Sequence, residues 1–217
     1  MFNFCSLYSG SSGNSLFVQT DNTKILVDAG ESAKKIETAL NSIDVKINDI
    51  DAVIVTHEHS DHIKGLSTIS KKFDIPIYAN KETWDAMPQV AEKTKNQNLF
   101  NVNQKFEIGD LKIVPFSIPH DAANPCGFNI FYNNQKISIA TDIGHIDKKI
   151  IKNLEESSFI LLESNYDPNI LSYSKYPYSL KQRIAGPNGH LSNEAAGKTV
   201  SYLLNSVVVA NNFDINK

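Results

Sequence analysis

A short run of histidines and acidic residues carries the clearest chemical signal in this sequence. Residues 56–62 read THEHSDH, so three of the chain's six histidines fall within this run. Imidazole and carboxylate groups together suit Zn, Mn or Fe, and do not suit Ca or Mg alone. His57 and His59 are two residues apart and share one side of an extended backbone, whereas Asp61 and His62 begin a predicted helix. The run therefore predicts ligands for two neighbouring metal ions.

Further candidate ligands follow other predicted strands. The run AVIVT at 52–56 is typical of a buried strand and leads directly into the histidines. His120 and Asp142 each come after a later strand-like run. Because side chains at the carboxyl ends of strands meet at the edge where α/β proteins keep their sites, we expect these residues to complete the metal site. The predicted ligands are His57, His59 and His120 for one ion, Asp61 and His62 for the other, and Asp142 as a bridging carboxylate.

The elements that must position these residues alternate between strand and helix patterns. The predicted strands are residues 15–20, 24–28, 52–56, 76–79, 111–118, 127–132, 136–141, 159–163 and 207–210. The predicted helices are residues 31–43, 61–73, 147–154 and 192–204, with Ser192 as the N-cap of the last. Hairpins mixed with helical crossovers indicate one α/β domain over residues 1–217, with two sheets between helices.

Composition is that of an ordinary globular protein. The 217 residues include 41% hydrophobic residues and carry a net charge of −3, so general adhesion to nucleic acid is not expected, although a local basic patch is possible. No apolar run is long enough to span a membrane, and the first residues do not resemble a signal peptide. Cys5 and Cys126 are expected to be free thiols, which favours a cytoplasmic protein without membrane contact.

Three weaker signals each leave two interpretations open. The segment 9–14, SGSSGN, is either a turn between strands or part of the site. The basic residues Lys175, Lys181 and Arg183 alternate with tyrosines, as in a surface that binds phosphates and stacked bases, or they belong to a solvated loop. His190 is either a proton donor to the leaving oxygen or a residue that fixes its loop.

The sequence resembles a known family at these same residues. HEHSDH after a strand resembles the HxHxDH motif of the metallo-β-lactamase-fold hydrolases, and His120 and Asp142 match the next two ligand positions of that family by order and spacing. Several segments also resemble its YycJ/WalJ-like branch. They are SGSSGN at 9–14, PHDAANPCGF at 119–128, ATDIGH at 140–145, LLESNYDP at 161–168 and YPYSLKQRIAGPNGHLSNEAAG at 176–197.

The resemblance implies an αββα sandwich that holds two divalent metal ions, Zn or Mn. It also implies a metal-dependent phosphodiesterase, with a DNA exonuclease as the leading expectation. Two metal ions can hold a hydroxide nucleophile and clamp the attacking and leaving oxygens of a phosphodiester. Asp61 would orient or deprotonate the attacking water and His190 would protonate the leaving group. Asn14, Lys181 and Arg183 would contact substrate.

One position departs from the family pattern. The family generally supplies one more histidine after a late strand, but the chain reads VVVANNFDINK after 206 and no histidine follows His190. The expectation is therefore a domain that is short at its C-terminus and has a weak second metal site. Three explanations of the absent histidine are open. The chain is a shortened form, or His190 takes the place of the absent ligand, or the second site is weak and only one ion is held firmly. A thioester or lactone hydrolase and a catalytically impaired form are the alternative functions, because one fold hosts many activities.

Overall fold

A computed structural model describes residues 1–210 of the chain, and the side chains of residues 1–204. The chain divides into two compact units. Unit 1 contains residues 1–115, 122–126 and 130–135, and the described part of unit 2 contains residues 116–121, 127–129 and 136–210. The prediction of a single domain over residues 1–217 stays a prediction.

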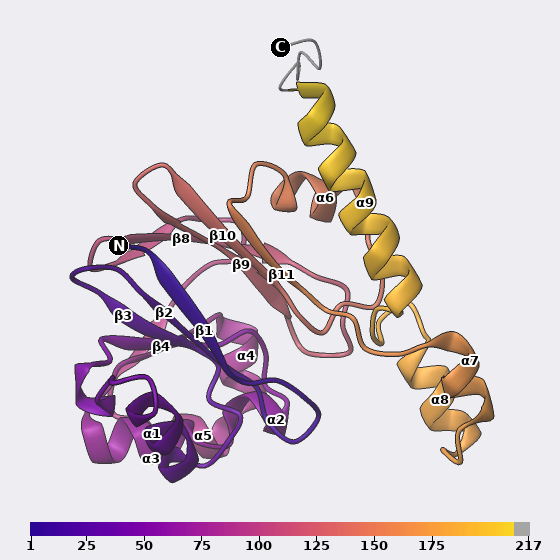
Figure 1. Cartoon of the computed structure of the whole chain (residues 1–217). Coiled ribbons are helices and arrows are strands. Elements are labelled where there is room, and N and C mark those ends of the chain that lie inside the picture. The colour runs from indigo at the N-terminus through magenta and orange to yellow at the C-terminus, as the bar shows by residue number, and fades with distance from the viewer. Residues whose placement is uncertain (211–217) are drawn as a thin grey trace. The chain divides into compact units, whose positions relative to one another are not determined.

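Unit 1 contains a six-stranded sheet with the strands in chain order (Figure 1). The strands are β1 (Asn3–Tyr8), β2 (Ser15–Gln19), β3 (Lys24–Val27), β4 (Ala52–Ile54), β5 (Ile77–Ala79) and β6 (Gln97–Leu99). The first three strands are paired antiparallel, which confirms the predicted hairpin of β2 and β3. The pairings from β3 to β6 are parallel. Parallel β3, β4 and β5 therefore end at the same edge of the sheet.

Helices cover one face of this sheet (Figure 1). Their bounds are α1 (Ala33–Asn41), α2 (Ser60–Ile63), α3 (Leu66–Phe73), α4 (Lys81–Ala86) and α5 (Pro88–Ala91), with a 3₁₀ turn η1 (Ile47–Asp49). Ile36 of α1 and Leu66 of α3 are fully buried in one core with Leu26 and Val53 of the strands. This burial holds β4, and hence the histidine-rich loop after it, in a fixed position.

A second five-stranded sheet has the order β11-β10-β9-β8-β7. Its strands are β7 (Phe106–Ile108), β8 (Leu111–Ser117), β9 (Cys126–Tyr132), β10 (Gln135–Ala140) and β11 (Phe159–Leu162). The helices of unit 2 are α6 (Lys148–Leu154), α7 (Pro168–Tyr173), α8 (Tyr178–Ile184) and α9 (Asn193–Ala210). Ile150 and Leu154 of α6 pack with Leu203 of α9 in the core of unit 2. The predicted mixed α/β class with two sheets and helices is confirmed.

Two predicted elements differ from the structure. The predicted strand 207–210 is wrong, because these residues belong to α9. A short apolar run rich in valine fits a strand or a buried helix equally well. The predicted helix 61–73 is interrupted at Gly65, whose amide donates to Ala29 O over 2.7 Å. A Cβ atom at Gly65 would lie 2.4 Å from Glu31 O, so the chain needs glycine where it bends.

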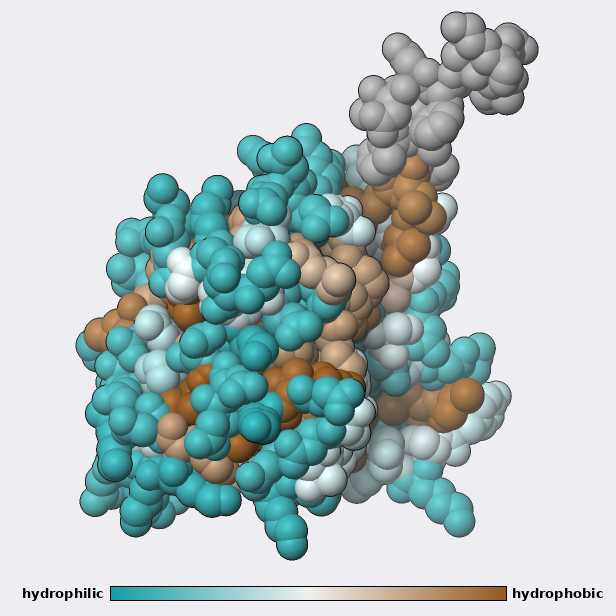
Figure 2. Space-filling view, turned by 60° about the vertical axis from the view of Figure 1, so that its left-hand side comes forward, coloured by the Kyte–Doolittle hydropathy of each residue, from teal (hydrophilic) through white to brown (hydrophobic). Residues whose placement is uncertain are grey.

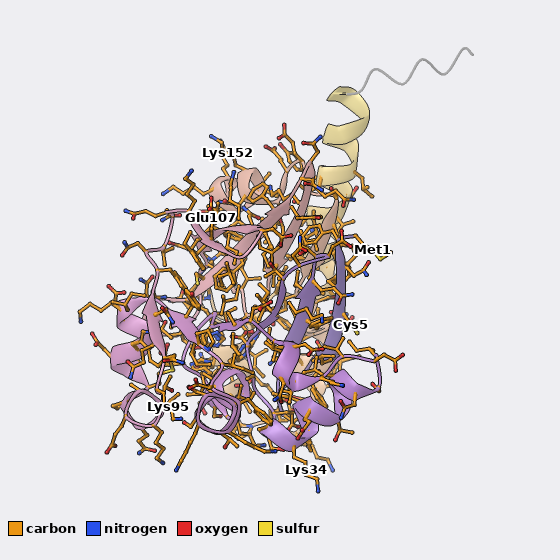
Figure 3. All side chains as sticks on the ribbon, turned by 90° about the vertical axis from the view of Figure 1, so that its left-hand side faces the viewer. Met1, Cys5, Lys34, Lys95, Glu107 and Lys152 are labelled. Carbon is orange, nitrogen blue, oxygen red and sulfur yellow. The ribbon has the colours of Figure 1, made fainter. Side chains whose placement is uncertain are left out.

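Charged side chains lie at the surface, and large apolar side chains are exposed on several elements, among them Leu99 of β6, Ile170 of α7 and Leu204 of α9. Figure 3 shows labelled charged side chains, such as Lys34 and Lys152, pointing outward. Figure 2 shows hydrophobic surface on α9, which exposes Val200 and Leu204. Within residues 1–210, no helix is both long and apolar enough to cross a membrane. Cys5 and Cys126 are free thiols, as predicted.

Candidate metal centre

In unit 1, three imidazoles gather where β4 ends. Val55 and Thr56 lead from the strand to His57, which is fully buried. His59 is the N-cap of α2, and His62 lies within that helix. The ring of His57 lies 4.6 Å from that of His59 and 4.1 Å from that of His62, measured between centroids. Strand, loop and short helix thus bring together the three histidines that the sequence singles out.

A buried carboxylate that the sequence reasoning missed orients two of these rings. Asp28 Oδ2 lies 2.8 Å from His62 Nδ1 and accepts a 2.8 Å hydrogen bond from Thr56 Oγ1. Because the Thr56 hydroxyl donates to Asp28, its oxygen accepts from His57 Nδ1, 3.0 Å away. Both imidazoles therefore carry their proton on Nδ1 and their lone pair on Nε2, the arrangement of a metal-binding histidine with an outer acceptor. Asp28 directly follows β3, and that position was the available signal.

Asn14 and Asp61 lie beside this group. Asn14 Nδ2 is 3.2 Å from Asp61 Oδ2 and 3.1 Å from His62 Nε2. The backbone also joins them, since Asn14 N donates to Asp61 O over 2.7 Å. A Cβ atom at Gly30 would lie 1.6 Å from Asp61 O, so only glycine allows this approach. The segment 9–14 is the connection between β1 and β2, and its last residue reaches the candidate ligands of unit 1.

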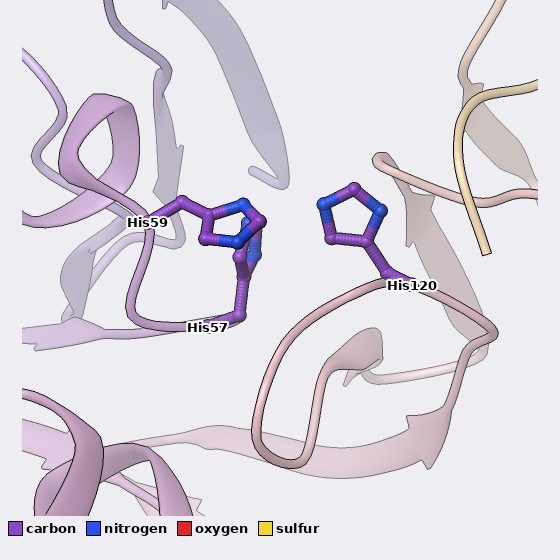
Figure 4. A group of neighbouring side chains, drawn as sticks. All are labelled: His57, His59 and His120. Atoms are coloured by element: carbon purple, nitrogen blue, oxygen red, sulfur yellow. The ribbon is translucent and has the colours of Figure 1, made fainter. Parts of the chain in front are cut away.

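His120, a further candidate ligand, lies in the loop that follows β8. Figure 4 shows this loop and the loop that carries His57 and His59. In unit 2, His120 is nearly fully buried, and its Nδ1 lies 3.0 Å from Gly189 O. The carbonyl can only accept, so the proton of His120 is on Nδ1, as in His57 and His62. Burial lowers the pKa of His120 below its ordinary value and favours the neutral imidazole. A neutral imidazole is the form that binds a metal.

Asp142 lies at the end of β10 beside His190. Its backbone is left-handed, with φ 55°, a conformation that aspartate tolerates better than most residues. Asp142 Oδ1 is 3.6 Å from His190 Nδ1, and the rings of His190 and His120 are 5.3 Å apart. Unit 2 therefore brings together three of the predicted site residues.

Glu163, a second carboxylate that the sequence reasoning missed, organises the loops of unit 2. Its Oε2 accepts from Ile143 N over 2.9 Å and from Leu191 N over 3.1 Å, and its Oε1 lies 2.7 Å from His190 Nδ1. This hydrogen bond raises the pKa of His190 above its ordinary value. Asp142, Glu163 and His190 form one group whose ligand atoms lie within 4.8 Å of one another. Glu163 follows β11, as Asp28 follows β3.

The predicted substrate-binding cations of unit 2 have partners in the protein. Arg183 forms a two-point ion pair with Asp121, with Nε to Oδ2 at 2.6 Å and Nη2 to Oδ1 at 3.2 Å. Lys181 Nζ donates to Ser172 O over 2.7 Å. Their contact with substrate stays a prediction. Outside the site, His145 Nδ1 lies 2.8 Å from Pro187 O.

The donor set fits divalent transition metals. Imidazole nitrogens and carboxylate oxygens at strand ends are ligands for Zn, Mn and Fe. Each of His57, His62 and His120 has an outer acceptor on Nδ1, which fixes the ring for coordination through Nε2. This ligand chemistry is present in the described residues of both units.

Comparisons with known proteins agree with this chemistry. A sequence model of the beta-lactamase superfamily domain matches residues 23–210. The chain is 40% identical to exodeoxyribonuclease YycJ of Bacillus anthracis, covering 89% of this chain and 74% of the relative. It is 38% identical to exodeoxyribonuclease WalJ of Streptococcus pneumoniae, and the match covers 89% of this chain and 73% of that relative.

Solved structures show the same fold. The metallo-beta-lactamase fold protein YhfI of Bacillus subtilis has a TM-score of 0.67 at 18% identity, covering 89% of this chain and 75% of that one. The short form of human tRNase Z has a TM-score of 0.66 at 17% identity, and the match covers 93% of this chain and 88% of that one. The chain belongs to the metallo-β-lactamase superfamily and, within it, to the family of the YycJ and WalJ proteins.

Proposed function

We propose that this protein is a metal-dependent exodeoxyribonuclease that hydrolyses phosphodiester bonds. The observation that carries the proposal is the similarity to YycJ and WalJ over 89% of the chain, together with metal-ligand chemistry at the strand ends. The alternative of a thioester or lactone hydrolase, or an impaired form, is not favoured, because these two relatives are named exodeoxyribonucleases.

We assign one ion to His57, His59 and His120, and a second to Asp61, His62 and Asp142, with Asp142 as the bridging carboxylate. The proposal is supported by the ligand chemistry of these side chains and by the outer acceptors that orient three of the histidines. Zn or Mn suits both sets. The second set has one imidazole against three in the first, so we expect the second ion to be held more weakly.

When bound, the two ions would supply a nucleophile at neutral pH and balance charge on the phosphate. Asp61 would orient the attacking water and accept its proton at the carboxylate, which Asn14 Nδ2 steadies. His190 would deliver a proton from Nε2 to the leaving oxygen. Its Nδ1 faces Glu163, which favours the protonated ring.

We further propose that DNA runs over Lys181 and Arg183, and that the protein works in the bacterial cytoplasm. The cytoplasm is supported by the two free thiols, which are typical of a reducing compartment.

The test is His59→Ala, with His145→Gln as the matched control. We expect His59→Ala to lose bound metal and nearly all release of nucleotides from labelled DNA, because it removes one of three imidazoles from a single ion. The control changes a histidine outside both ligand sets and should retain metal and activity. Metal content is measured by elemental analysis on both variants. Full activity of metal-free His59→Ala would overturn the proposal.

A further inference from the structure

Three tyrosines are exposed at the junction of α7 and α8. Tyr173 ends α7, Tyr178 begins α8, and Tyr176 lies between them. Their exposed fractions are 90%, 75% and 55%, respectively. Aromatic side chains usually bury much of their surface, so three exposed rings within six residues are not explained by packing.

The backbone that carries these rings is firmly held. Asp167 caps α7 by accepting from Asn169 N and Ile170 N, at 2.8 and 3.1 Å. Lys181 Nζ of α8 donates to Ser172 O of α7, so the two helices are joined side by side. The buried side chain of Leu171 anchors α7 from beneath. The rings are therefore presented from an ordered segment, which lowers the entropy cost of binding a ligand.

The charge around the rings is positive. Residues 164–190 contain three basic residues, Lys175, Lys181 and Arg183, and one acidic residue, Asp167. Asp121 pairs with Arg183, so these five residues carry a net charge of +1, although the whole chain has a net charge of −3. The carboxylate of Asp167 already accepts two backbone hydrogen bonds. An anionic partner is therefore favoured on this surface over a cationic or neutral one.

The same segment leads directly to the candidate site residues of unit 2. His190 N donates to Ile184 O, the last residue of α8, over 2.9 Å. Arg183 of α8 binds Asp121, the residue after His120. A nucleic-acid strand bound on α7 and α8 would therefore lead towards His120 and His190.

We propose that the α7–α8 segment, residues 168–184, binds single-stranded DNA by stacking unpaired bases on Tyr173, Tyr176 and Tyr178. This inference rests on the proposed nuclease function and names its substrate as single-stranded ends. Stacking on aromatic rings combined with nearby cations is the usual means of holding single strands without reading their sequence. Bases in a duplex are already stacked on each other and gain nothing from these rings.

The test compares the metal-loaded wild type with a Tyr173→Ala/Tyr178→Ala double variant and the corresponding Phe double variant. The probe is a fluorescent phosphorothioate oligothymidylate, which resists hydrolysis, and binding is followed by anisotropy. We expect the Ala variant to bind at least about tenfold more weakly, because stacking is lost at two rings. The Phe variant should bind like wild type. Tyr202→Ala, which removes an exposed tyrosine from α9, is the matched control and should change nothing.

Two further probes separate stacking from charge. An abasic phosphorothioate strand should bind wild type and the Ala variant equally, and so should a blunt duplex. Equal affinity of wild type and the Ala variant for oligothymidylate would overturn the inference, as would a Phe variant as weak as the Ala variant. An equal loss for the duplex would indicate a general contact and overturn it too. Wild-type hydrolysis of unmodified DNA tests the proposed function separately, because its absence leaves these binding results intact.

Discussion

At the scale of single residues, the carboxylate of Asp28 has the largest influence on the histidines of unit 1. It accepts from Thr56 N and Thr56 Oγ1, and it contacts His62 Nδ1, all at 2.8 Å. A ligand histidine whose outer acceptor is removed loses its fixed ring orientation and some of its basicity. Asp28 thus acts on a metal ion through the imidazoles rather than by direct contact.

We predict that Asp28→Asn weakens metal affinity by about 10- to 100-fold. Asparagine fits the left-handed backbone at this position, φ 62°, so the change tests the carboxylate rather than the fold. The measurement is a competition titration with a chromogenic chelator. Asp49→Asn, at a partly exposed residue paired with Lys24, is the control and should keep wild-type affinity. An unchanged affinity in Asp28→Asn would refute the role given to this residue.

The HEHSDH motif at 57–62 was predictable from the sequence, because its residue types and spacing are specific. The carboxylates that accept hydrogen bonds from the site histidines were not predictable. Asp28 and Glu163 are single carboxylates after strands, and neither has a local pattern that marks it. Their roles follow from contacts with residues 28 to 34 positions away for Asp28, and 20 to 28 positions away for Glu163. Only the folded chain brings these partners together.

At the scale of elements, two glycines lie in different surroundings, so replacing each by alanine should change the stability of the protein in opposite directions. Gly30 has Asp61 O where a Cβ atom would lie, at 1.6 Å, whereas a Cβ atom at Gly197 in α9 would meet open space outside the backbone of its own helix. The first contact is with backbone and cannot be relieved by a rotamer change. The second position is an exposed helix interior, where glycine costs conformational entropy.

We predict that Gly30→Ala destabilises the protein by more than about 3 kcal/mol or prevents folding. Gly197→Ala should instead stabilise it by up to about 1 kcal/mol, because alanine has the higher helix propensity. Urea unfolding of the two variants beside wild type measures both effects. A stable Gly30→Ala variant would show that the approach of Gly30 to Asp61 is not required.

The longer elements were predictable where periodicity or alternation was strong. The β2–β3 hairpin and the segments of β8 to β11 agree with prediction to within about two residues, as boundaries usually do. The strands β1, β6 and β7 and the helices α4, α5, α7 and α8 were missed, because three to seven residues carry too little pattern. The break at Gly65 was missed because a contact distant in sequence causes it.

At the scale of the whole molecule, a metal that binds only the folded chain must stabilise it. A ligand at about 100 times its dissociation constant adds about 2.7 kcal/mol to the free energy of unfolding. For a chain of this size, each kcal/mol raises the melting temperature by about 2–4 °C.

We therefore predict that Zn or Mn raises the melting temperature of chelator-treated protein by about 5–10 °C. His59→Ala should lose most of this rise, because one ion lacks a ligand. Differential scanning fluorimetry with and without metal gives the values. A shift in His59→Ala as large as in wild type would contradict the assignment of His59 to a metal.

The most direct test of the central claim compares linear and circular single-stranded DNA as substrates of the chelator-treated, metal-reloaded protein. An exodeoxyribonuclease needs a strand end, so we predict that the linear strand is degraded to nucleotides and the circular strand persists. Neither strand should be degraded before metal is restored. Cleavage of the circle at the rate of the linear strand, or no cleavage of either by fully loaded protein, would contradict the account.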